Sequence, residues 1–451
     1  MTTSTHPPRS PLPLASPSGE NSLGKNIDYE TFMDCVHCGL CLGSCPTYVE
    51  TGNENDSPRG RIYLWRAVAD GRAPLTPEAK EHLDLCLECK ACETACPSGV
   101  HYGEIISSYK KDMARLGKPF PQLNFLQRWM LFHLTPYANR MTWALAPLRM
   151  AQRLGLRRVL DTMGAILPRS LRGMQQMVPR LEPGHGRLPE FLPAEGKRRA
   201  RVMLVVGCAA DAFYPRTTVA TARVLQRNGC EVLIPRSQGC CGALHYHAGQ
   251  VSPAQQFAIQ NGLSIEKELS GLDAIITNAG GCGPVLKDYG HLLAGTPHEA
   301  MGQAFSAKVR DIHEFLVTLG PVAPTHPLPM TATYHDACGL SHGQKIRTQP
   351  RQLLGMIPEL KLVPLAESEH CCGAAGSYNI TQPEMSEEIG KRKARHILAT
   401  GAEAVFTGNV GCLLQITRYL QAEKPDFWVA HPIEALWDSY SGTNPRSTRS
   451  R

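Results

Sequence analysis

The chain has 451 residues, of which 42% are hydrophobic and 19% are charged, the balance of a folded protein rather than a disordered one. This length exceeds what one ordinary core holds, so we expect several domains. No apolar run is as long as the about 18 residues needed to span a bilayer. The first residues of the sequence also lack the apolar stretch that is typical of a signal peptide. We therefore expect a location in the reducing cytoplasm, where the 17 cysteines serve as ligands rather than as disulfides.

Residues 1–30 are rich in Pro, Ser and Thr and are predicted to be a flexible leader. Residues 31–112 form the first predicted domain and contain eight cysteines in two dense groups. Between the groups lies SPRGRIYLWRAVADG, in which Pro58 and the later apolar spacing predict a helix.

The two cysteine groups share one spacing, Cys35-x-x-Cys38-x-x-Cys41-x-x-x-Cys45-Pro46 and Cys86-x-x-Cys89-x-x-Cys92-x-x-x-Cys96-Pro97. This run is typical of bacterial ferredoxins, in which three thiolates bind one [4Fe-4S] cluster and the fourth cysteine binds the other cluster. We therefore expect one cluster on Cys35, Cys38, Cys41 and Cys96, and a second on Cys86, Cys89, Cys92 and Cys45. A pair of four-cysteine zinc sites is the alternative, but zinc sites usually show two separated CxxC units.

Residues 113–197 are predicted to form a basic helical connector. Between Arg115 and Arg180 it has eleven Lys or Arg residues and a single acid, Asp161, so much of the net charge of +7 lies here. The basic residues alternate with Trp129, Phe132, Tyr137 and Trp143. Such a stretch can lie on an anionic membrane surface or dock a partner, and ordinary packing with solvated arginines is the third interpretation.

The rest of the chain predicts a duplicated α/β domain, with repeats at residues 198–324 and 325–440 and a flexible tail at 441–451. Short β-rich runs such as RVMLVVGC alternate with helical ones, and the same order returns from MTATYHDAC onward. The matching cysteines are offset by 130, 131 and 130 residues, and each repeat contains a Cys-Cys-Gly sequence. The fold class is therefore α+β multidomain, a helical two-cluster ferredoxin-type module followed by this duplication.

Each repeat has four cysteines that follow the carboxyl ends of predicted strands. In open α/β sheets, ligand-binding sites form at this edge of the sheet. The cysteines are Cys208, Cys240, Cys241 and Cys282 in the first repeat, and Cys338, Cys371, Cys372 and Cys412 in the second. Four thiolates suit a further iron–sulfur cluster or zinc, whereas the alternative is buried free cysteines. Cys230 fits no motif and is assigned to the core. The nearby histidines are candidates for ligands, proton relays or structural residues, with the structural role preferred: His245, His247, His335 and His370.

No GxGxxG or GK[ST] sequence occurs, so the chain shows no nucleotide fingerprint and a flavin or nicotinamide is expected on another polypeptide. We find no catalytic residue in the chain itself.

The segments CVHCGLCLGSCPTY, SPRGRIYLWRAV, EHLDLCLECKACETACPSGVHYG, CCGALHYHAG and EHCCGAAGSYNI resemble the iron–sulfur subunit of bacterial glycolate oxidase, from about Asp34 to Trp437. The Cys-Cys-Gly repeats are shared with a wider group, in which each repeat commonly ends in CxxC. Here the first positions of that pair are Ala279 and Asn409, which argues against five-thiolate non-cubane clusters.

The resemblance implies a complex in which flavin-bearing subunits oxidise glycolate to glyoxylate while this chain carries electrons toward a membrane quinone. Because no flavin site is visible in the sequence, we expect the isolated chain to be inactive on glycolate. The resemblance and the basic connector are compatible with peripheral contact at the inner face of the cytoplasmic membrane. Two alternatives remain open: a subunit of a lactate or anaerobic glycerol-3-phosphate dehydrogenase, and a heterodisulfide-reductase-like catalytic subunit. A third class, a nucleic-acid-binding cluster protein, would draw on the net positive charge. No nucleic-acid-binding module accompanies the positive charge, so no nucleic-acid partner is expected.

Overall fold

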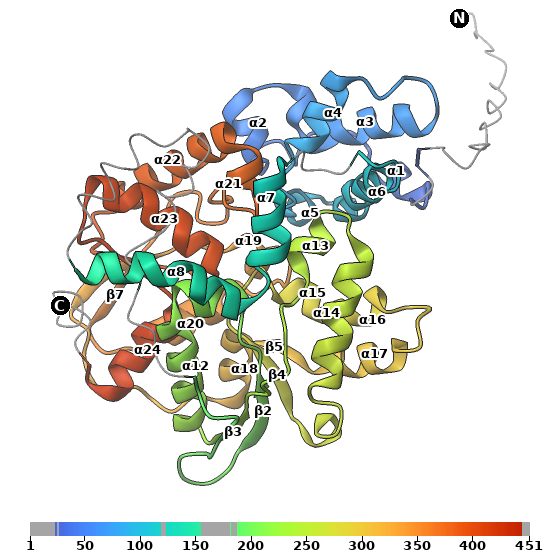
Figure 1. Ribbon diagram of the computed structural model, residues 1–451. Coiled ribbons are helices and arrows are strands. Elements are labelled where there is room, and N and C mark those ends of the chain that lie inside the picture. Colours follow the sequence, from blue (N-terminus) through green and yellow to red (C-terminus); the bar gives the residue numbers. More distant parts are fainter. Residues whose placement is uncertain (1–22, 25–26, 119–122, 155–180, 182–186, 444–451) are drawn as a thin grey trace, which may run out of the picture.

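The computed structural model describes residues 23–24, 27–118, 123–154, 181 and 187–443. A helical module lies against one end of two α/β units, and the described part of the connector packs on the outside of the first unit (Figure 1). Most of the predicted leader, residues 1–22, and of the predicted tail, residues 444–451, lies outside the described residues.

The helical module is built around a small aromatic core. Trp65 and Tyr109 are fully buried and meet edge to face with their ring centroids 5.2 Å apart. The helix expected after Ser57 forms, because Pro58 occupies its first turn and the Ser57 side chain accepts a hydrogen bond from the Gly60 N–H. The helices of the module are α1 (Glu30–Met33), α2 (Pro46–Thr51), η1 (Glu54–Asp56), α3 (Pro58–Ala69), α4 (Pro77–Asp84), α5 (Ala91–Ala95) and α6 (Tyr102–Arg115).

The first α/β unit has a five-stranded sheet in the order β1-β3-β2-β4-β5. Only β1 runs antiparallel, against β3. The strands are β1 (Phe191–Leu192), β2 (Ala200–Leu204), β3 (Cys230–Leu233), β4 (Ala274–Thr277) and β5 (Val309–Asp311). The helices are α11 (Cys208–Phe213), α12 (Pro215–Arg227), α13 (Ala243–His247), α14 (Val251–Leu263), η3 (Leu269–Gly271), α15 (Gly283–Lys287), α16 (Tyr289–Leu292), α17 (Glu299–Lys308) and α18 (Ile312–Leu319).

The second unit repeats this arrangement with a parallel sheet in the order β7-β6-β8-β9. Its strands are β6 (Met330–Tyr334), β7 (Leu360–Val363), β8 (Ala404–Phe406) and β9 (Trp428–Ala430). Its helices are α19 (Cys338–Ser341), α20 (Gln349–Gly355), α21 (Tyr378–Thr381), α22 (Pro383–Ala399), α23 (Val410–Glu423) and α24 (Pro432–Ser441).

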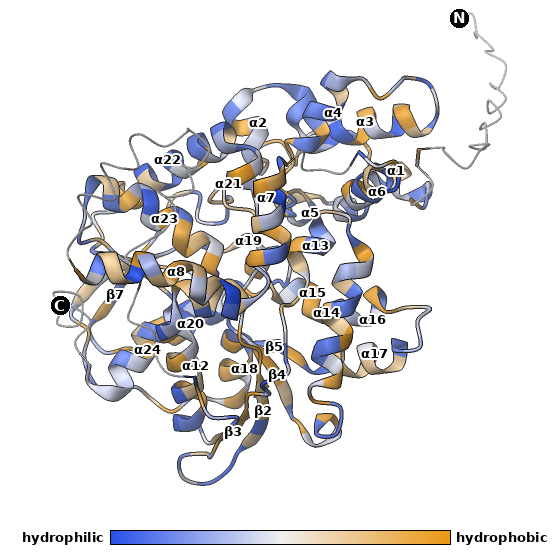
Figure 2. Ribbon diagram, viewed as in Figure 1, coloured by the Kyte–Doolittle hydropathy of each residue, from blue (hydrophilic) through white to orange (hydrophobic). Residues whose placement is uncertain are grey.

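The strand registers confirm the duplication. Val202 pairs with Ala274 in the first sheet, and Ala332 pairs with Ala404 in the second, a shift of 130 residues for both partners. One apolar core contains residues of both sheets, among them Val202 and Phe406, so the two repeats are packed against each other. Figure 2 shows the apolar strands of the first sheet between more polar outer helices. The predicted fold class is confirmed.

The connector begins with a regular helical cap and then packs on the first repeat. Asn124 and Gln127 form a capping box at the start of α7 (Phe125–Trp129), which continues through the π-helical turn η2 (Met130–Leu134) before α8 (Ala138–Arg153). Phe132 packs beside Ala248, and Met141 packs beside Ala212. Residues 155–180, with Arg157, Arg158, Arg169, Arg172, Arg180 and Asp161, lie outside the described residues.

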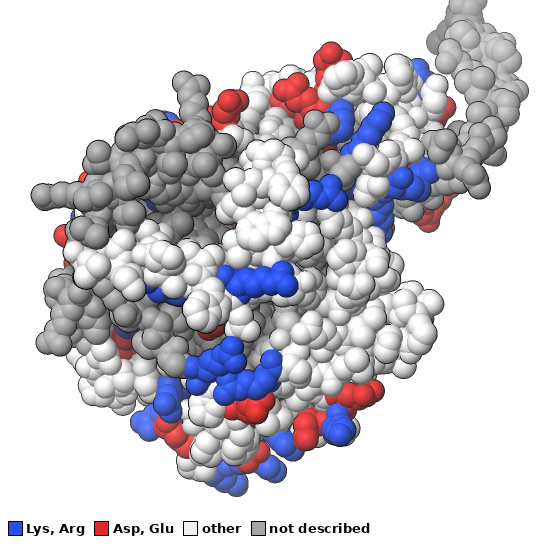
Figure 3. All heavy atoms as spheres, in the orientation of Figure 1, with Lys and Arg blue, Asp and Glu red and all other residues white. Residues whose placement is uncertain are grey.

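The described part of the connector is more apolar at its surface than its sequence predicts. Trp143 is 80% exposed and Trp129 is 45% exposed, whereas two of the arginines are tied to backbone oxygens. Arg149 donates to the Ala212 carbonyl at 2.6 Å, and Arg140 donates to the His133 carbonyl at 2.7 Å. In Figure 3 the surface over α7 and α8 is mostly uncharged, with isolated basic patches. Within the described ranges, no helix is long and apolar enough to cross a membrane.

Candidate iron–sulfur and thiolate sites

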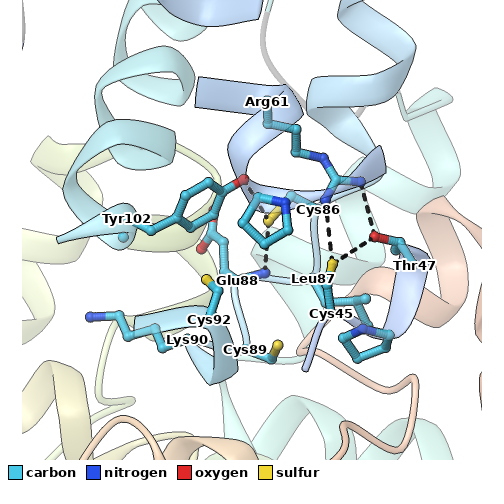
Figure 4. A pocket seen from close by; sticks show the side chains of 13 residues that line it. Cys45, Thr47, Arg61, Cys86, Leu87, Glu88, Cys89, Lys90, Cys92 and Tyr102 are labelled. Atoms are coloured by element: carbon cyan, nitrogen blue, oxygen red, sulfur yellow. Dashed lines mark hydrogen bonds between the residues drawn. The ribbon is translucent and has the colours of Figure 1, made fainter. Parts of the chain in front are cut away.

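The clearest candidate site is a small, partly open hollow in the helical module. Cys45, Cys86, Cys89 and Cys92 line it, and their sulfur atoms surround its centre in Figure 4. Cys45 immediately precedes α2, whereas the other three lie on the loop after α4 and on the first turn of α5. The hollow therefore combines three cysteines of the second run with the last cysteine of the first run.

Arg61 brings a buried positive charge to this hollow from α3. Its side chain is only 2% exposed. The guanidinium donates to the His82 carbonyl at 2.6 Å, to Thr47 Oγ1 at 3.1 Å and to Cys45 Sγ at 3.9 Å. Asp56 lies 3.8 Å away and balances the charge. A buried cation beside the sulfur atoms favours thiolates and a negatively charged cluster.

Two further donors point at Cys86. The Glu88 N–H lies 3.4 Å from Cys86 Sγ, and the Tyr102 hydroxyl lies 3.5 Å from it. Burial raises the pKa of the Cys86 thiol, and it raises the pKa of Cys92 well above the ordinary value. Buried thiols with raised pKa values lose their protons together only beside strong positive charge, and the iron of a cluster would supply it. The donor set and the hollow thus fit a [4Fe-4S] cluster.

The other four cysteines of the module are more exposed to solvent as a group. Cys38 is exposed, while Cys35, Cys41 and Cys96 are half-buried and pack against the same aromatic core. The loop between them turns tightly, with His37 and Gly39 both at positive φ. Burial raises the pKa of the Cys41 thiol, and the neighbouring Cys35 adds to the shift.

The first Cys-Cys-Gly repeat gathers its cysteines at the carboxyl edge of the sheet, where the alternation of strands and helices predicts them. Cys208 follows β2, Cys240 and Cys241 follow β3, and Cys282 follows β4. Cys208 Sγ and Cys240 Sγ are 3.6 Å apart, and the Cys241 thiol lies close enough to those of Cys240 and Cys282 to interact with both. The four thiols therefore form one contiguous group.

The second repeat gathers the corresponding four. The Cys371 thiol contacts those of Cys338 and Cys372, and the Cys372 thiol contacts that of Cys412. His335 joins this group, because a ring nitrogen of His335 and the sulfur atoms of Cys372 and Cys412 all lie within 4.8 Å of one another.

A buried lysine accompanies the second group. Lys393 on α22 is 3% exposed and donates to the Glu367 carbonyl. Burial lowers the pKa of Lys393 to about 8, although the nearby Cys372 and Cys371 oppose this shift. The second repeat thus has its own cation beside its thiols, as the ferredoxin hollow has Arg61.

The ferredoxin loop that contains Cys86 and Cys89 contacts both repeats. Leu87 and Cys89 pack with Cys371 and Cys338 of the second repeat in one apolar cluster. The Tyr378 hydroxyl donates to the Leu85 carbonyl at 2.9 Å. On the other side of the loop, Glu88 binds Lys110 and lies 2.8 Å from His247 of the first repeat.

The candidate histidines separate into different environments. His247 is held by Glu88, and His370 lies 3.4 Å from Glu367, so both have ordinary polar partners. His245 lies between Phe132 and Phe257, with its Nδ1 atom lacking a hydrogen-bond partner. Cys230 is fully buried in the apolar core.

Some site residues were not predicted from the sequence. Arg61, Tyr102 and Lys393 approach cysteines that are distant in the sequence, so motif spacing alone does not identify them. The available signals are the position of Arg61 within SPRGRIYLWRAV and that of Tyr102 within EHLDLCLECKACETACPSGVHYG, two of the segments that carry the family resemblance. Asn409 replaces the first cysteine of the CxxC pair, and it accepts from the Gly281 N–H at 3.1 Å and donates to Cys412 Sγ at 3.5 Å.

The chain combines a two-cluster ferredoxin module with a duplicated cysteine-rich α/β domain. This combination places it in the class of iron–sulfur proteins. Residues 31–100 match the 4Fe-4S dicluster domain, which implies two [4Fe-4S] clusters, and residues 202–287 and 332–417 each match the cysteine-rich domain. Residues 124–178 match the linker region of the glycolate oxidase iron–sulfur subunit.

Curated relatives agree with these matches. The probable glycolate oxidase iron–sulfur subunit of Bacillus subtilis is 38% identical over 90% of this chain and 92% of its own length. The glycolate oxidase iron–sulfur subunit of Escherichia coli is 32% identical over 84% of this chain and 88% of its own length. A subunit of the fumarate reductase (CoM/CoB) of Methanothermobacter marburgensis is 27% identical over 92% of this chain and 73% of its own length. The chain belongs to the family of glycolate oxidase iron–sulfur subunits, as its motifs predict.

Proposed function

We propose that this chain carries electrons from flavin-bearing subunits, which oxidise glycolate to glyoxylate, toward a membrane quinone. The observation that carries the proposal is the hollow lined by Cys45, Cys86, Cys89 and Cys92, with Arg61 beside it. Membership in the glycolate oxidase iron–sulfur family supports the substrate.

The chain's own residues would position and tune the clusters. When bound, each [4Fe-4S] cluster supplies one-electron redox chemistry. Around the hollow, Arg61 supplies positive charge, and the Glu88 N–H and the Tyr102 hydroxyl supply hydrogen bonds to sulfur. Both features stabilise the more negative, reduced state and therefore raise the reduction potential.

The oxidation of glycolate tests the division of labour between subunits. The purified chain should not reduce a dye with glycolate, and activity should appear when the flavin-bearing subunits are added. The sequence has no flavin fingerprint to supply the first electron acceptor. Glycolate-dependent dye reduction by the chain alone would contradict the proposal.

The ligand assignment has its own test. Cys45→Ser should damage the cluster on Cys86, Cys89 and Cys92, and Cys96→Ser should damage the cluster on Cys35, Cys38 and Cys41. Electron paramagnetic resonance (EPR) spectra of the two reduced variants should therefore lose different signals. If Cys45→Ser instead removes the cluster on Cys35, Cys38 and Cys41, the crossed ligation is wrong.

We also propose that the contiguous thiols of each Cys-Cys-Gly repeat hold metal. The support is their contact geometry and, in the second repeat, the buried cation of Lys393. Anaerobically purified protein should contain more iron or zinc than two [4Fe-4S] clusters account for, and Cys372→Ser should remove part of the excess. If the protein contains only the iron of two [4Fe-4S] clusters, the cysteines of the Cys-Cys-Gly repeats do not bind metal and are structural.

The exposed apolar face of α7 and α8 is proposed as the docking surface of the chain. Among the described residues, Phe125, Trp129 and Trp143 are large apolar side chains exposed on this face. The flavin-bearing subunits are the expected partner, and peripheral contact with the cytoplasmic face of the membrane is the other arm of the test. Sedimentation with anionic vesicles and co-purification with the flavin-bearing subunits distinguish the two.

A further inference from the structure

The second Cys-Cys-Gly group includes a buried imidazole that lies within 4.8 Å of two of its sulfur atoms. His335 directly follows β6, is fully buried, and reaches the sulfur atoms of Cys372 and Cys412. Its Nδ1 atom lies 3.1 Å from the Ser368 carbonyl, which holds the proton on Nδ1. The Nε2 atom has no hydrogen-bond partner. A buried imidazole with one nitrogen fixed by a carbonyl and the other free is prepared to bind metal.

The duplication provides an internal comparison. In the first repeat the residue that directly follows β2 is Val205. Its N–H donates to the Ile276 carbonyl at 2.8 Å, and the His335 N–H donates to the Phe406 carbonyl at 2.9 Å. These pairs are offset by 130 residues, so Val205 and His335 occupy the same backbone position. Valine offers no ligand. Among the described residues, only the second repeat has three metal-binding side chains whose ligand atoms all lie within 4.8 Å of one another.

We propose that His335 Nε2 is a ligand of an iron–sulfur cluster in the second repeat, whereas the first repeat binds through thiolates alone. The inference rests on the proposed metal binding by the Cys-Cys-Gly cysteines. Iron is favoured as the metal because Cys371 packs against Cys89, a proposed ligand of a ferredoxin cluster. A redox-active occupant of that place can exchange electrons with the neighbouring cluster.

The imidazole has a direct consequence for electron flow. A neutral nitrogen ligand makes a cluster less negative than a fourth thiolate does, and histidine-ligated clusters have higher potentials than all-cysteine ones. The reduced ferredoxin cluster on Cys45, Cys86, Cys89 and Cys92 would then lose one electron, and the second-repeat centre would gain it. The second repeat is thus the next carrier after that cluster, and the first repeat is not equivalent to it.

The test uses the full chain, purified anaerobically after labelling with ¹⁵N-histidine. Pulsed EPR should detect coupling of a reduced cluster to a histidine nitrogen in the wild type and in His370→Gln, the matched control in the same region. The coupling should disappear in His335→Gln. His335→Cys should keep the iron of the second repeat through a new thiolate, lose the nitrogen coupling, and lower the potential of that centre.

Several outcomes would overturn the inference. Nitrogen coupling that persists in His335→Gln, or a wild type with iron in the second repeat but no coupling, excludes His335 as a ligand. Zinc instead of iron in the second repeat excludes the redox role. If Cys372→Ser and Cys412→Ser leave the metal content unchanged, the metal proposal itself fails and the histidine proposal fails with it.

Discussion

Replacing Arg61 should change both the stability of the protein and the potential of the cluster beside it. In Arg61→Met, Asp56 keeps His82 at 2.8 Å but loses its buried cationic partner. The hydrogen bonds to the His82 carbonyl and to Thr47 are lost as well. Breaking a buried ion pair from one side costs about 3–5 kcal/mol, so the variant should unfold at a clearly lower temperature.

The effect on the potential follows from the distance between charge and sulfur. Arg61 Nη1 is 3.9 Å from Cys45 Sγ. At an effective dielectric constant of about 20, two unit charges at this separation interact by about 4 kcal/mol, an upper limit of roughly 180 mV for one electron. Because the charge of a cluster is spread over many atoms, we expect a potential about 50–100 mV more negative in Arg61→Met.

An EPR-monitored redox titration measures this shift, and two variants control it. Arg61→Lys keeps the positive charge, so its potential should stay within about 30 mV of wild type. Arg66→Met removes an arginine of the same helix that contacts Tyr29 and Asp70 rather than a thiol, and it should leave the potential unchanged. A potential that rises in Arg61→Met, or falls equally in Arg61→Lys, would refute the electrostatic reasoning.

Three further changes have defined outcomes. Trp143→Ala, at an 80% exposed position, should leave the thermal midpoint unchanged but weaken co-purification with the flavin-bearing subunits; equal co-purification would count against the docking surface. Gly60→Ala should lower the midpoint because an added Cβ would meet the Glu54 carbonyl oxygen at 2.0 Å, and an unchanged midpoint would show that this turn relaxes freely. Glu367→Gln should cost more stability near neutral pH than at pH 2, because Arg392 holds the pKa of Glu367 at about 2; a cost as large at pH 2 as at neutral pH would contradict this sign.

The sign of the last effect follows from linkage. A carboxylate with a depressed pKa in the folded state contributes stability above its unfolded pKa of about 4.3. That contribution is lost as the pH falls through the folded pKa of about 2. Unfolding curves of wild type and Glu367→Gln at several pH values would therefore converge on the acid side.

Structural features that depend on residues close together in the sequence could be predicted well. The ferredoxin spacing is a property of short loops, and the helix after Ser57 depends on a cap and a proline that are adjacent in the sequence. The duplication was visible because Cys208 and Cys338 begin the same order of strands and helices. The cysteines of both repeats also lie at the carboxyl edge of their sheets, as parallel strands require.

Contacts between distant segments were not predictable from spacing. The packing of Cys89 against Cys371 depends on how the helical module docks on the second repeat, for which one sequence contains no pattern. The connector shows the same limit, because its composition predicts a basic surface, whereas Arg149 is bound to the Ala212 carbonyl and Trp143 faces outward. Among the candidate histidines, His335 is distinguished by its position within 4.8 Å of the Cys372 and Cys412 sulfur atoms, which sequence spacing does not predict.

The most direct test of electron transfer by this chain is freeze-quench EPR of its anaerobic complex with the flavin-bearing subunits. After mixing with glycolate and without an acceptor, the signals of reduced [4Fe-4S] clusters should appear at least as fast as steady-state turnover. Flavin reduction with clusters that stay oxidised, while turnover with acceptor continues at its normal rate, would contradict the account.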